Sequence, residues 1–321
     1  MKYAYCGNSG LQLPRISLGL WHNFGFINDY ETAREMILHA FEKGVTHFDL
    51  ANNYGPPPGS AEINFGKILK ENLASHRDEM IISSKAGHLM WEGPYGDGSS
   101  RKYLMASINQ SLRRTGLEYF DIFYTHRYDP NTPVEETMQA LVDMVRQGKA
   151  LYIGISKYPP LQARIAMHYL KERDVPCLIF QDKYSMFHRK PEEEILDITA
   201  GQGSGFIAFS PLAQGVLTDK YLNGIPASSR AAEPDGFLRE DQVTAALVEK
   251  VKKLHILAGE RGQTMAGMAL AWALRDGRVT SLIVGARNTG QLDNSLKALQ
   301  HLVFTQEELV RIDEILDGAM L

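Results

Sequence analysis

Cysteine is scarce in this sequence, which has only Cys6 and Cys177 among its 321 residues. Two cysteines are too few for a disulfide framework, and neither belongs to a CxxC pair. Neither belongs to a cysteine–histidine cluster with the spacing of a metal site. We therefore expect both to be reduced structural thiols in the cytoplasm, and we expect no metal in the functional site.

Long apolar runs and an excess of one charge are also missing. No segment approaches the roughly 18 apolar residues of a membrane span, and the amino terminus lacks a basic segment followed by an apolar stretch, the mark of a secretory signal. The formal net charge is -4 with both signs interspersed, so there is no basic stripe for nucleic acid and no polybasic segment for anionic lipid. We expect an unexported soluble protein whose partners are small molecules or other proteins.

What the chain does contain is a repeating alternation of strands and helices. Apolar residues make up 44% of the sequence, enough for one large barrel or for two ordinary domains. The expected strands are 16–20, 46–49, 79–85, 119–125, 151–156, 177–181, 205–210 and 281–284, with helical segments between them. This order predicts an α/β fold, a (β/α)8 TIM barrel forming a single domain over residues 1–321. A β-hairpin over 3–14 would precede it, and extra helices near the carboxyl terminus would include 242–261 and 306–317.

Local signals predict finer features of the helices and loops. Asp29 is expected to cap the helix that starts near Tyr30. Residues 132–135, TPVE, have the form of a capping box with proline at the first helical position. Two long loops, 87–100 and 211–241, are expected to overhang one rim of the barrel, the first as a lid or binding loop.

Three consecutive strands each deliver one ionisable side chain at the carboxyl end. These side chains are Asp49, Lys85 and His126, and Tyr54 follows the first of them by five residues. Because the carboxyl ends of parallel barrel strands meet at one rim, we expect the four side chains to gather there. Taken one by one, they are more simply explained as core residues, a strand cap or an ion-pair partner. Their joint placement favours a catalytic site.

These residue types suit the protonation of an oxygen atom. A tyrosine hydroxyl, with an unperturbed pKa of about 10, is a poor donor to a carbonyl at neutral pH. We expect the Lys85 ammonium to lower the pKa of Tyr54, where a shift of about three units corresponds to roughly 4 kcal/mol, and Asp49 to keep the lysine charged. His126 is expected to align the substrate oxygen. Since no nucleophile is evident, a cofactor would supply hydride to the carbon.

At this point the sequence resembles the aldo-keto reductase superfamily over essentially its whole length. The resemblance rests on FDLANNY (48–54), SKAG (84–87), YFDIFYTHR (119–127), YIGIS (152–156), FSPLAQGVLTDKY (209–221) and SLIVGARNTGQL (281–292). It is similar to the branch that holds the potassium-channel β-subunits and the bacterial reductases of L-glyceraldehyde 3-phosphate and methylglyoxal. Segments 18–25, 52–62 and 221–230 make it most similar to those reductases.

The resemblance implies a (β/α)8 barrel that binds NADPH in an extended pose. It implies a catalytic tetrad of Asp49, Tyr54, Lys85 and His126, with Tyr54 as the proton donor. The implied cofactor-binding residues are Trp21, Asp49, Ser156 and Gln181 near the nicotinamide, Ser210, Leu212, Gly215, Lys220 and Arg230 near the pyrophosphate, and Gly285, Arg287, Gln291 and Asn294 around the adenosine. Arg287 stands where the channel-like branch often has serine. It adds a cation able to pair with a 2′-phosphate, which favours NADPH over NADH.

The expected substrate is a small polar aldehyde, with L-glyceraldehyde 3-phosphate and methylglyoxal as the leading candidates. The residues expected to contact it are Trp21, Tyr54, Trp91, Tyr95, His126, Arg127 and Tyr158. Trp91 and Tyr95 would equally well serve only to hold their own loop.

Two other functions stay open at this stage. One is a nucleotide-binding regulatory subunit resembling the channel β-subunits, and the other is a cofactor-free isomerase or lyase using the same lysine and tyrosine. Relatives in this branch assemble into tetramers or larger rings, so a homo-oligomer is expected.

Overall fold

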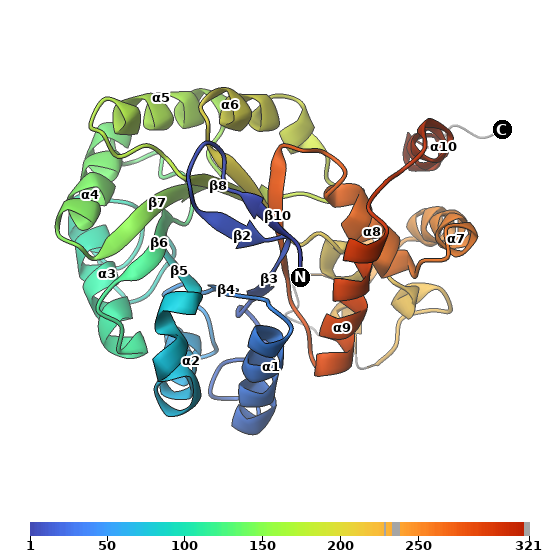
Figure 1. The fold of residues 1–321 in the computed structure, drawn as a ribbon, viewed down its shortest axis with the longest axis horizontal. Helices are drawn as coiled ribbons and strands as arrows, with labels where there is room; N and C mark the ends of the chain where they lie inside the picture. The colour runs from blue at the N-terminus through green and yellow to red at the C-terminus, as the bar shows by residue number, and fades with distance from the viewer. Residues whose placement is uncertain (228, 233–237, 318–321) are drawn as a thin grey trace.

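Eight parallel strands close into a barrel in the computed structural model, which describes residues 1–227, 229–232 and 238–317. Around the ring, each strand pairs with the next in the order β10, β3, β4, β5, β6, β7, β8, β9 (Figure 1). The strands are β3 (Ile16–Gly19), β4 (His47–Asp49), β5 (Ile81–Ala86), β6 (Phe120–Thr125), β7 (Ala150–Ser156), β8 (Ile179–Lys183), β9 (Gly205–Phe209) and β10 (Val279–Val284). The predicted (β/α)8 barrel is confirmed.

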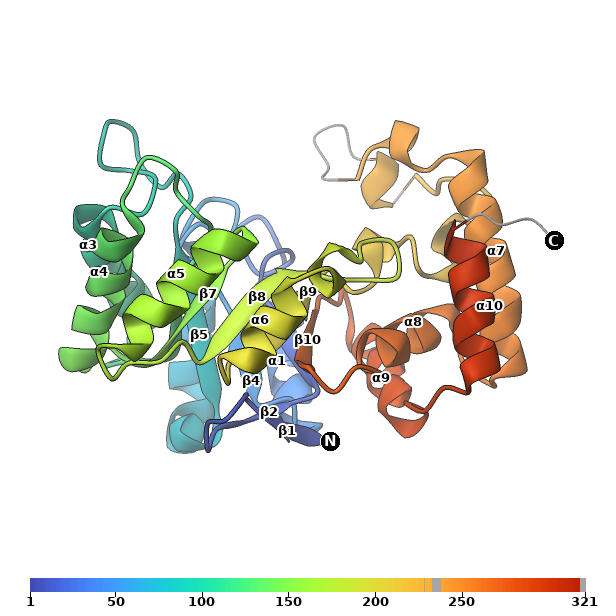
Figure 2. The same ribbon diagram turned by 90° about the horizontal axis from the view of Figure 1, so that it is seen from above.

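The amino-terminal hairpin lies across the opposite end of the barrel from the long loops (Figure 2). Its strands β1 (Tyr3–Tyr5) and β2 (Gln12–Pro14) pair antiparallel. The turn between them is held against the barrel by a hydrogen bond of 2.8 Å from the Asn8 amide to the Gly203 carbonyl. Gly7 has φ 57°, and a Cβ there would lie 2.0 Å from the same carbonyl oxygen, so only glycine fits this close approach.

Helices surround the barrel and bury their apolar faces against the strands (Figure 1). They are α1 (Tyr30–Glu42), α2 (Ser60–Ile68), α3 (Arg101–Thr115), α4 (Val134–Arg146), α5 (Pro160–Lys171), α6 (Ile195–Gly201), α8 (Met265–Ala273) and α9 (Thr289–Lys297). Two extra helices, α7 (Ala245–Glu260) and α10 (Gln306–Asp317), lie side by side outside the ring (Figure 2) and are joined by an ion pair of 2.6 Å between Glu260 and Arg311. Among the described residues, no helix is long and apolar enough to cross a bilayer.

The predictions for two helix starts had different outcomes. Asp29 caps α1 as predicted, since its carboxylate accepts a 2.7 Å hydrogen bond from the Thr32 amide. The predicted capping box at 132–135 is wrong. Pro133 is the N-cap of α4 and supplies no side-chain cap, while the Thr132 hydroxyl donates to the Asp129 carboxylate at 2.7 Å. The nearby carboxylate captures the hydroxyl that the motif required at the helix start.

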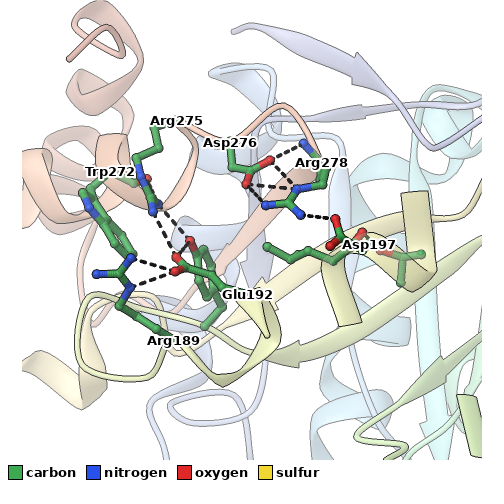
Figure 3. A network of polar contacts seen from close by, with 10 residues as sticks. Arg189, Glu192, Asp197, Trp272, Arg275, Asp276 and Arg278 are labelled. Atoms are coloured by element: carbon green, nitrogen blue, oxygen red, sulfur yellow. Dashed lines mark hydrogen bonds and ion pairs between the residues drawn. The ribbon is translucent and has the colours of Figure 1, made fainter. Parts of the chain in front are cut away.

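The helix expected over 191–200 is shorter in the structure, where α6 spans Ile195–Gly201. A polar network holds the residues that precede it (Figure 3). Glu192 ends the short 3-10 helix η3 (Lys190–Glu192) and accepts hydrogen bonds from Tyr184, Arg189 and Arg275 at 2.7, 2.8 and 3.0 Å. The guanidinium of Arg275 lies 3.7 Å above the Trp272 ring of α8. These contacts fix the segment after β8 against α8. A second group of ion pairs lies beside them and consists of Arg278, Asp276 and Asp197.

Candidate active site

A pocket of about 590 Å³ opens at the carboxyl ends of the barrel strands. Most residues predicted for the site line it: Trp21, Asp49, Tyr54, His126, Ser156, Gln181, Ser210, Leu212, Gly215, Lys220, Gly285, Arg287, Gln291 and Asn294. They come from segments separated by more than two hundred positions in the sequence. Closure of the barrel is what gathers them, because the ends of parallel strands point to the same rim.

The predicted residue Lys85 does not line the pocket but is buried behind Asp49 and Tyr54, which do line it, and it contacts both of them. It is the penultimate residue of β5, and Asp49 is the last residue of β4, the neighbouring strand. The Lys85 ammonium lies 2.6 Å from the Asp49 carboxylate, 2.6 Å from the Leu50 carbonyl and 3.3 Å from the Tyr54 hydroxyl. The ion pair is buried, with side-chain exposures of 0% for Lys85 and 2% for Asp49.

His126 faces Tyr54 across the pocket. It is the first residue after β6, and its ring lies edge-on to the Tyr54 ring with centroids 5.8 Å apart. Its Nδ1 atom is buried and has no hydrogen-bond partner within the described part of the chain. A tyrosine hydroxyl and an imidazole therefore face the same pocket, where each could hydrogen-bond one substrate oxygen.

The direction of the Tyr54 pKa shift differs from the prediction. Burial raises the pKa of Tyr54 well above its usual value, and the Asp49 carboxylate raises it further. A lowered pKa was expected from Lys85, but the charge of Lys85 is offset by Asp49 at 2.6 Å. Burial lowers the pKa of Lys85, which the attraction of Asp49 opposes. In this structure Tyr54 is therefore a firmly protonated phenol.

The imidazole of His126 is neutral at pH 7. Burial lowers the pKa of His126 well below its usual value, and the positive charge of Lys85 adds to the effect. The site thus presents two neutral donors above a buried ion pair. This arrangement can hold a carbonyl oxygen and deliver a proton as negative charge develops on it.

A buried chain of hydrogen bonds supports Asp49 from inside the barrel. His47 bonds the Ser17 hydroxyl at 2.8 Å and the Ser83 hydroxyl at 3.0 Å, and Ser83 donates to Asp49 at 2.8 Å. The other donor to this carboxylate oxygen is Gln181, at 3.2 Å. Burial lowers the pKa of His47 to about 4. Sequence reasoning missed this chain, although polar residues on interior strands were the available signal.

Four predicted substrate contacts are absent from the lining of this pocket: Trp91, Tyr95, Arg127 and Tyr158. Trp91 packs its ring against α3, and Tyr95 is 56% exposed. Arg127 is paired with Asp97 at 2.7 Å, and Tyr158 is only 3% exposed. Their own contacts hold them away from the cavity, which sequence spacing could not indicate.

Other polar residues line the pocket without having been predicted as site residues: His22, Asn23, Asn53, His88, Lys157, Gln214, Thr218 and Ser295. Three of them lie close to predicted positions, since His22 directly follows Trp21, Lys157 directly follows Ser156, and His88 comes three residues after Lys85. Such neighbours of strand ends were the signal that could have found them.

The outer part of the pocket fits a dinucleotide. Ser156 is the last residue of β7, and its buried hydroxyl has no hydrogen-bond partner among the residues that are described. After β9, the backbone curves through left-handed residues that include Ser210 at φ 53° and Gly215 at φ 98°. Concave backbone of this kind favours anions, and barrel enzymes often bind phosphate at the loops after strands seven and eight. The predicted residue Arg230 begins η6 (Arg230–Ala232), but its side chain lies outside the described part.

A metal-dependent arrangement has no support in the described residues. They include no group of three or more histidine, cysteine, aspartate or glutamate side chains that could hold a metal ion. Both cysteines are buried.

Comparison with known proteins gives close full-length relatives. A family model described as the aldo/keto reductase family matches residues 15–317. Two proteins named L-glyceraldehyde 3-phosphate reductase, from Escherichia coli O157:H7 and strain K12, are each 53% identical over 325 residues, covering 100% of this chain and 94% of theirs. A probable voltage-gated potassium channel subunit beta from Oryza sativa subsp. japonica is 35% identical over 316 residues, covering 97% of this chain and 94% of its own.

Proposed function

The chain belongs to the aldo/keto reductase family, and we propose that it reduces short aldehydes with NADPH, with L-glyceraldehyde 3-phosphate and methylglyoxal as the leading substrates. The observation that carries the proposal is the position of Lys85, whose ammonium lies 2.6 Å from Asp49 and 3.3 Å from the Tyr54 hydroxyl. The 53% identity to proteins named L-glyceraldehyde 3-phosphate reductase supports the choice of the phosphorylated substrate.

The cofactor would occupy the long pocket above the tetrad. Trp21, Ser156 and Gln181 would hold the nicotinamide, and the segment from Ser210 to Lys220 would hold the pyrophosphate with Arg230. Gly285, Arg287, Gln291 and Asn294 would hold the adenosine end. When bound, the cofactor supplies hydride to the substrate carbon. Arg287 is the reason to expect NADPH, because a guanidinium can pair with the 2′-phosphate that NADH lacks.

Tyr54 would act as the proton donor. Its raised pKa keeps the hydroxyl protonated until negative charge develops on the substrate oxygen beside it. The Lys85 ammonium at 3.3 Å would then stabilise the phenolate that remains. His126, neutral and facing the same pocket, would align the oxygen. The low exposure of Tyr54, Lys85 and His126 would strengthen each of these interactions, because little water competes there.

The test is a cofactor titration followed by a panel of aldehydes. NADPH fluorescence should change on binding, and oxidation of NADPH should follow addition of L-glyceraldehyde 3-phosphate or methylglyoxal. Tyr54→Phe serves as the matched control, since it removes one oxygen and keeps the ring. Wild-type protein that turns over no short aldehyde faster than this control would refute the proposal. A fluorescence change that is absent altogether would favour the cofactor-free isomerase or lyase.

A second candidate function is a nucleotide-binding regulatory subunit. The observation that favours it is 35% identity to a probable channel subunit beta over nearly the full length of both chains. It predicts NADPH binding and capture of a partner protein without turnover of any aldehyde. Measured turnover with a Tyr54-dependent rate would remove this candidate as the main function.

A further inference from the structure

Two basic side chains line the pocket without a part in the proton transfer described above. They are His88, two residues after β5, and Lys157, the residue after β7. The Lys157 ammonium lies 3.2 Å from Nε2 of His88. The two residues come from loops that flank His126, because β6 lies between β5 and β7 in the barrel.

Lys157 is held in a backbone conformation that lysine rarely adopts. Its φ is 57°, in the left-handed region, while its amide donates to the Gln181 carbonyl at 3.1 Å. Left-handed residues other than glycine carry strain and cluster at functional sites. This conformation at the strand end accompanies a side chain that lines the pocket.

The Lys157 ammonium has no carboxylate within ion-pair distance among the described residues. Burial lowers the pKa of Lys157 to about 8, and the repulsion of Lys85 acts in the same direction. The attraction of Asp182 opposes both effects without making an ion pair, and Arg127 adds a further repulsion. A partly desolvated cation that has no ion-pair partner in contact is unfavourable, so an anion bound here would stabilise it.

His88 orients this cation. Burial lowers the pKa of His88 to about 4, and the charge of Lys157 contributes, so at pH 7 the ring is neutral. A neutral Nε2 can accept a hydrogen bond from the ammonium at 3.2 Å. The Tyr103 hydroxyl donates to the His88 carbonyl at 2.5 Å, and the His88 ring packs edge-on to His126 at 4.5 Å. A continuous row therefore runs from the Tyr54 phenol through two imidazoles to the ammonium.

We propose that Lys157, positioned by His88, binds the phosphate group of the aldehyde substrate while Tyr54 and His126 hold its carbonyl oxygen. This proposal rests on the function proposed above. It assigns to Lys157 the preference for a phosphorylated aldehyde over an uncharged one. A compact ammonium with three donors suits a phosphate monoester. Uncharged aldehydes of the same length would lack this contact.

The cofactor pyrophosphate, the other anion proposed for this pocket, would bind at a different part of the rim. Its proposed residues follow β9, and those for the adenosine follow β10. In the barrel order β8 separates β7 from β9, so Lys157 lies on the side of His126 rather than beside the pyrophosphate segment.

The first experiment compares kcat/KM for L-glyceraldehyde 3-phosphate with kcat/KM for L-glyceraldehyde. Lys157→Gln removes one charge-assisted hydrogen bond, so it should lower the ratio of the two values by about tenfold or more. Lys157→Arg should keep most of the ratio, and His88→Gln should lower it less than Lys157→Gln. Lys171→Gln, at an exposed position of α5, is the matched control and should leave the ratio as in wild type.

The second experiment measures binding without turnover. Calorimetry with sn-glycerol 3-phosphate on protein saturated with NADP+ should show binding that Lys157→Gln weakens by about tenfold. An unchanged ratio in Lys157→Gln, or unchanged affinity for sn-glycerol 3-phosphate, would overturn the phosphate site. Competition of sn-glycerol 3-phosphate with NADPH instead of with aldehyde would also overturn it, by assigning Lys157 to the cofactor.

The two proposals fail in different ways. Wild-type protein that reduces neither aldehyde refutes the reductase function, and the calorimetry still tests the phosphate site. Wild-type protein that reduces both with equal kcat/KM keeps the function and refutes the site.

Discussion

Replacement of Lys85 by methionine should destabilise the fold as well as stop catalysis. The side chain is wholly buried and its ammonium makes hydrogen bonds of 2.6 Å to Asp49 and 2.6 Å to the Leu50 carbonyl. Methionine preserves much of the apolar stem and removes the charge. The Asp49 carboxylate, 2% exposed, would then keep only the hydrogen bonds from Ser83 and Gln181.

The expected loss follows from the unpaired charge. Removing one partner of a buried ion pair costs about 3 to 5 kcal/mol, because the remaining charge stays buried without compensation. Asp49→Asn in the Lys85→Met background removes that charge as well. Since apolar or neutral replacement of a whole buried pair is often neutral or better, the double variant should regain most of the loss. Neither variant should reduce aldehydes, because both lack the cation beside Tyr54.

The free energy of unfolding of wild type, Lys85→Met and the double variant can be measured by urea unfolding followed by circular dichroism. The thermal midpoint of each protein gives a second measurement. NADPH is left out, so that cofactor binding does not add to the stability of one form only. Lys85→Met as stable as wild type would refute the view that the pair is a buried, coupled unit. So would a double variant less stable than Lys85→Met. Activity in either variant would contradict the assigned role of the ammonium.

Three further predictions concern single residues. Tyr54→Phe should lower kcat by about 10²- to 10⁴-fold, the usual contribution of a positioned proton donor, and steady-state rates with saturating NADPH would show it. The pKa of His47 falls from 6.5 to about 4 in the fold, so below pH 6.5 the unfolded chain binds a proton that the native chain does not. The free energy of unfolding should therefore drop by about 3 kcal/mol between pH 6.5 and 4, and urea titrations should find a smaller drop in His47→Gln; equal drops would contradict this assignment. Arg287→Met should raise KM for NADPH by about tenfold relative to KM for NADH, whereas equal changes for both cofactors would assign Arg287 no 2′-phosphate contact.

The ionisable residues at the carboxyl ends of the strands were predictable, because only the pattern of apolar runs is needed to find them. Apolar runs ending near Asp49, Lys85 and His126 indicate parallel strands, and parallel strands in a barrel share one rim. The convergence of these side chains therefore followed from topology. The family resemblance carried the prediction further along the loops after β9 and β10, whose residues do line the pocket.

Contacts and charges that depend on side-chain packing were not predictable in the same way. The capping box at 132–135 failed because the Asp129 carboxylate, three residues earlier, takes the threonine hydroxyl. Arg127 carries a charge that suits a substrate, but its pairing with Asp97 keeps it out of the pocket lining. No periodicity in the sequence encodes which of two nearby partners a flexible side chain selects.

The order of elements, the barrel class and the gathering of the tetrad were determined by the sequence. Strand and helix periodicity is local, and the alternation of strands with helices predicts that neighbouring strands pair in parallel. The direction of the Tyr54 pKa shift was decided only by the tertiary structure. Burial sets that direction and the Asp49 carboxylate adds to it, and both effects exist only once the closed barrel has excluded water from these side chains. The pairing of His88 with Lys157 was decided in the same way, since it joins loops that meet only across the finished rim.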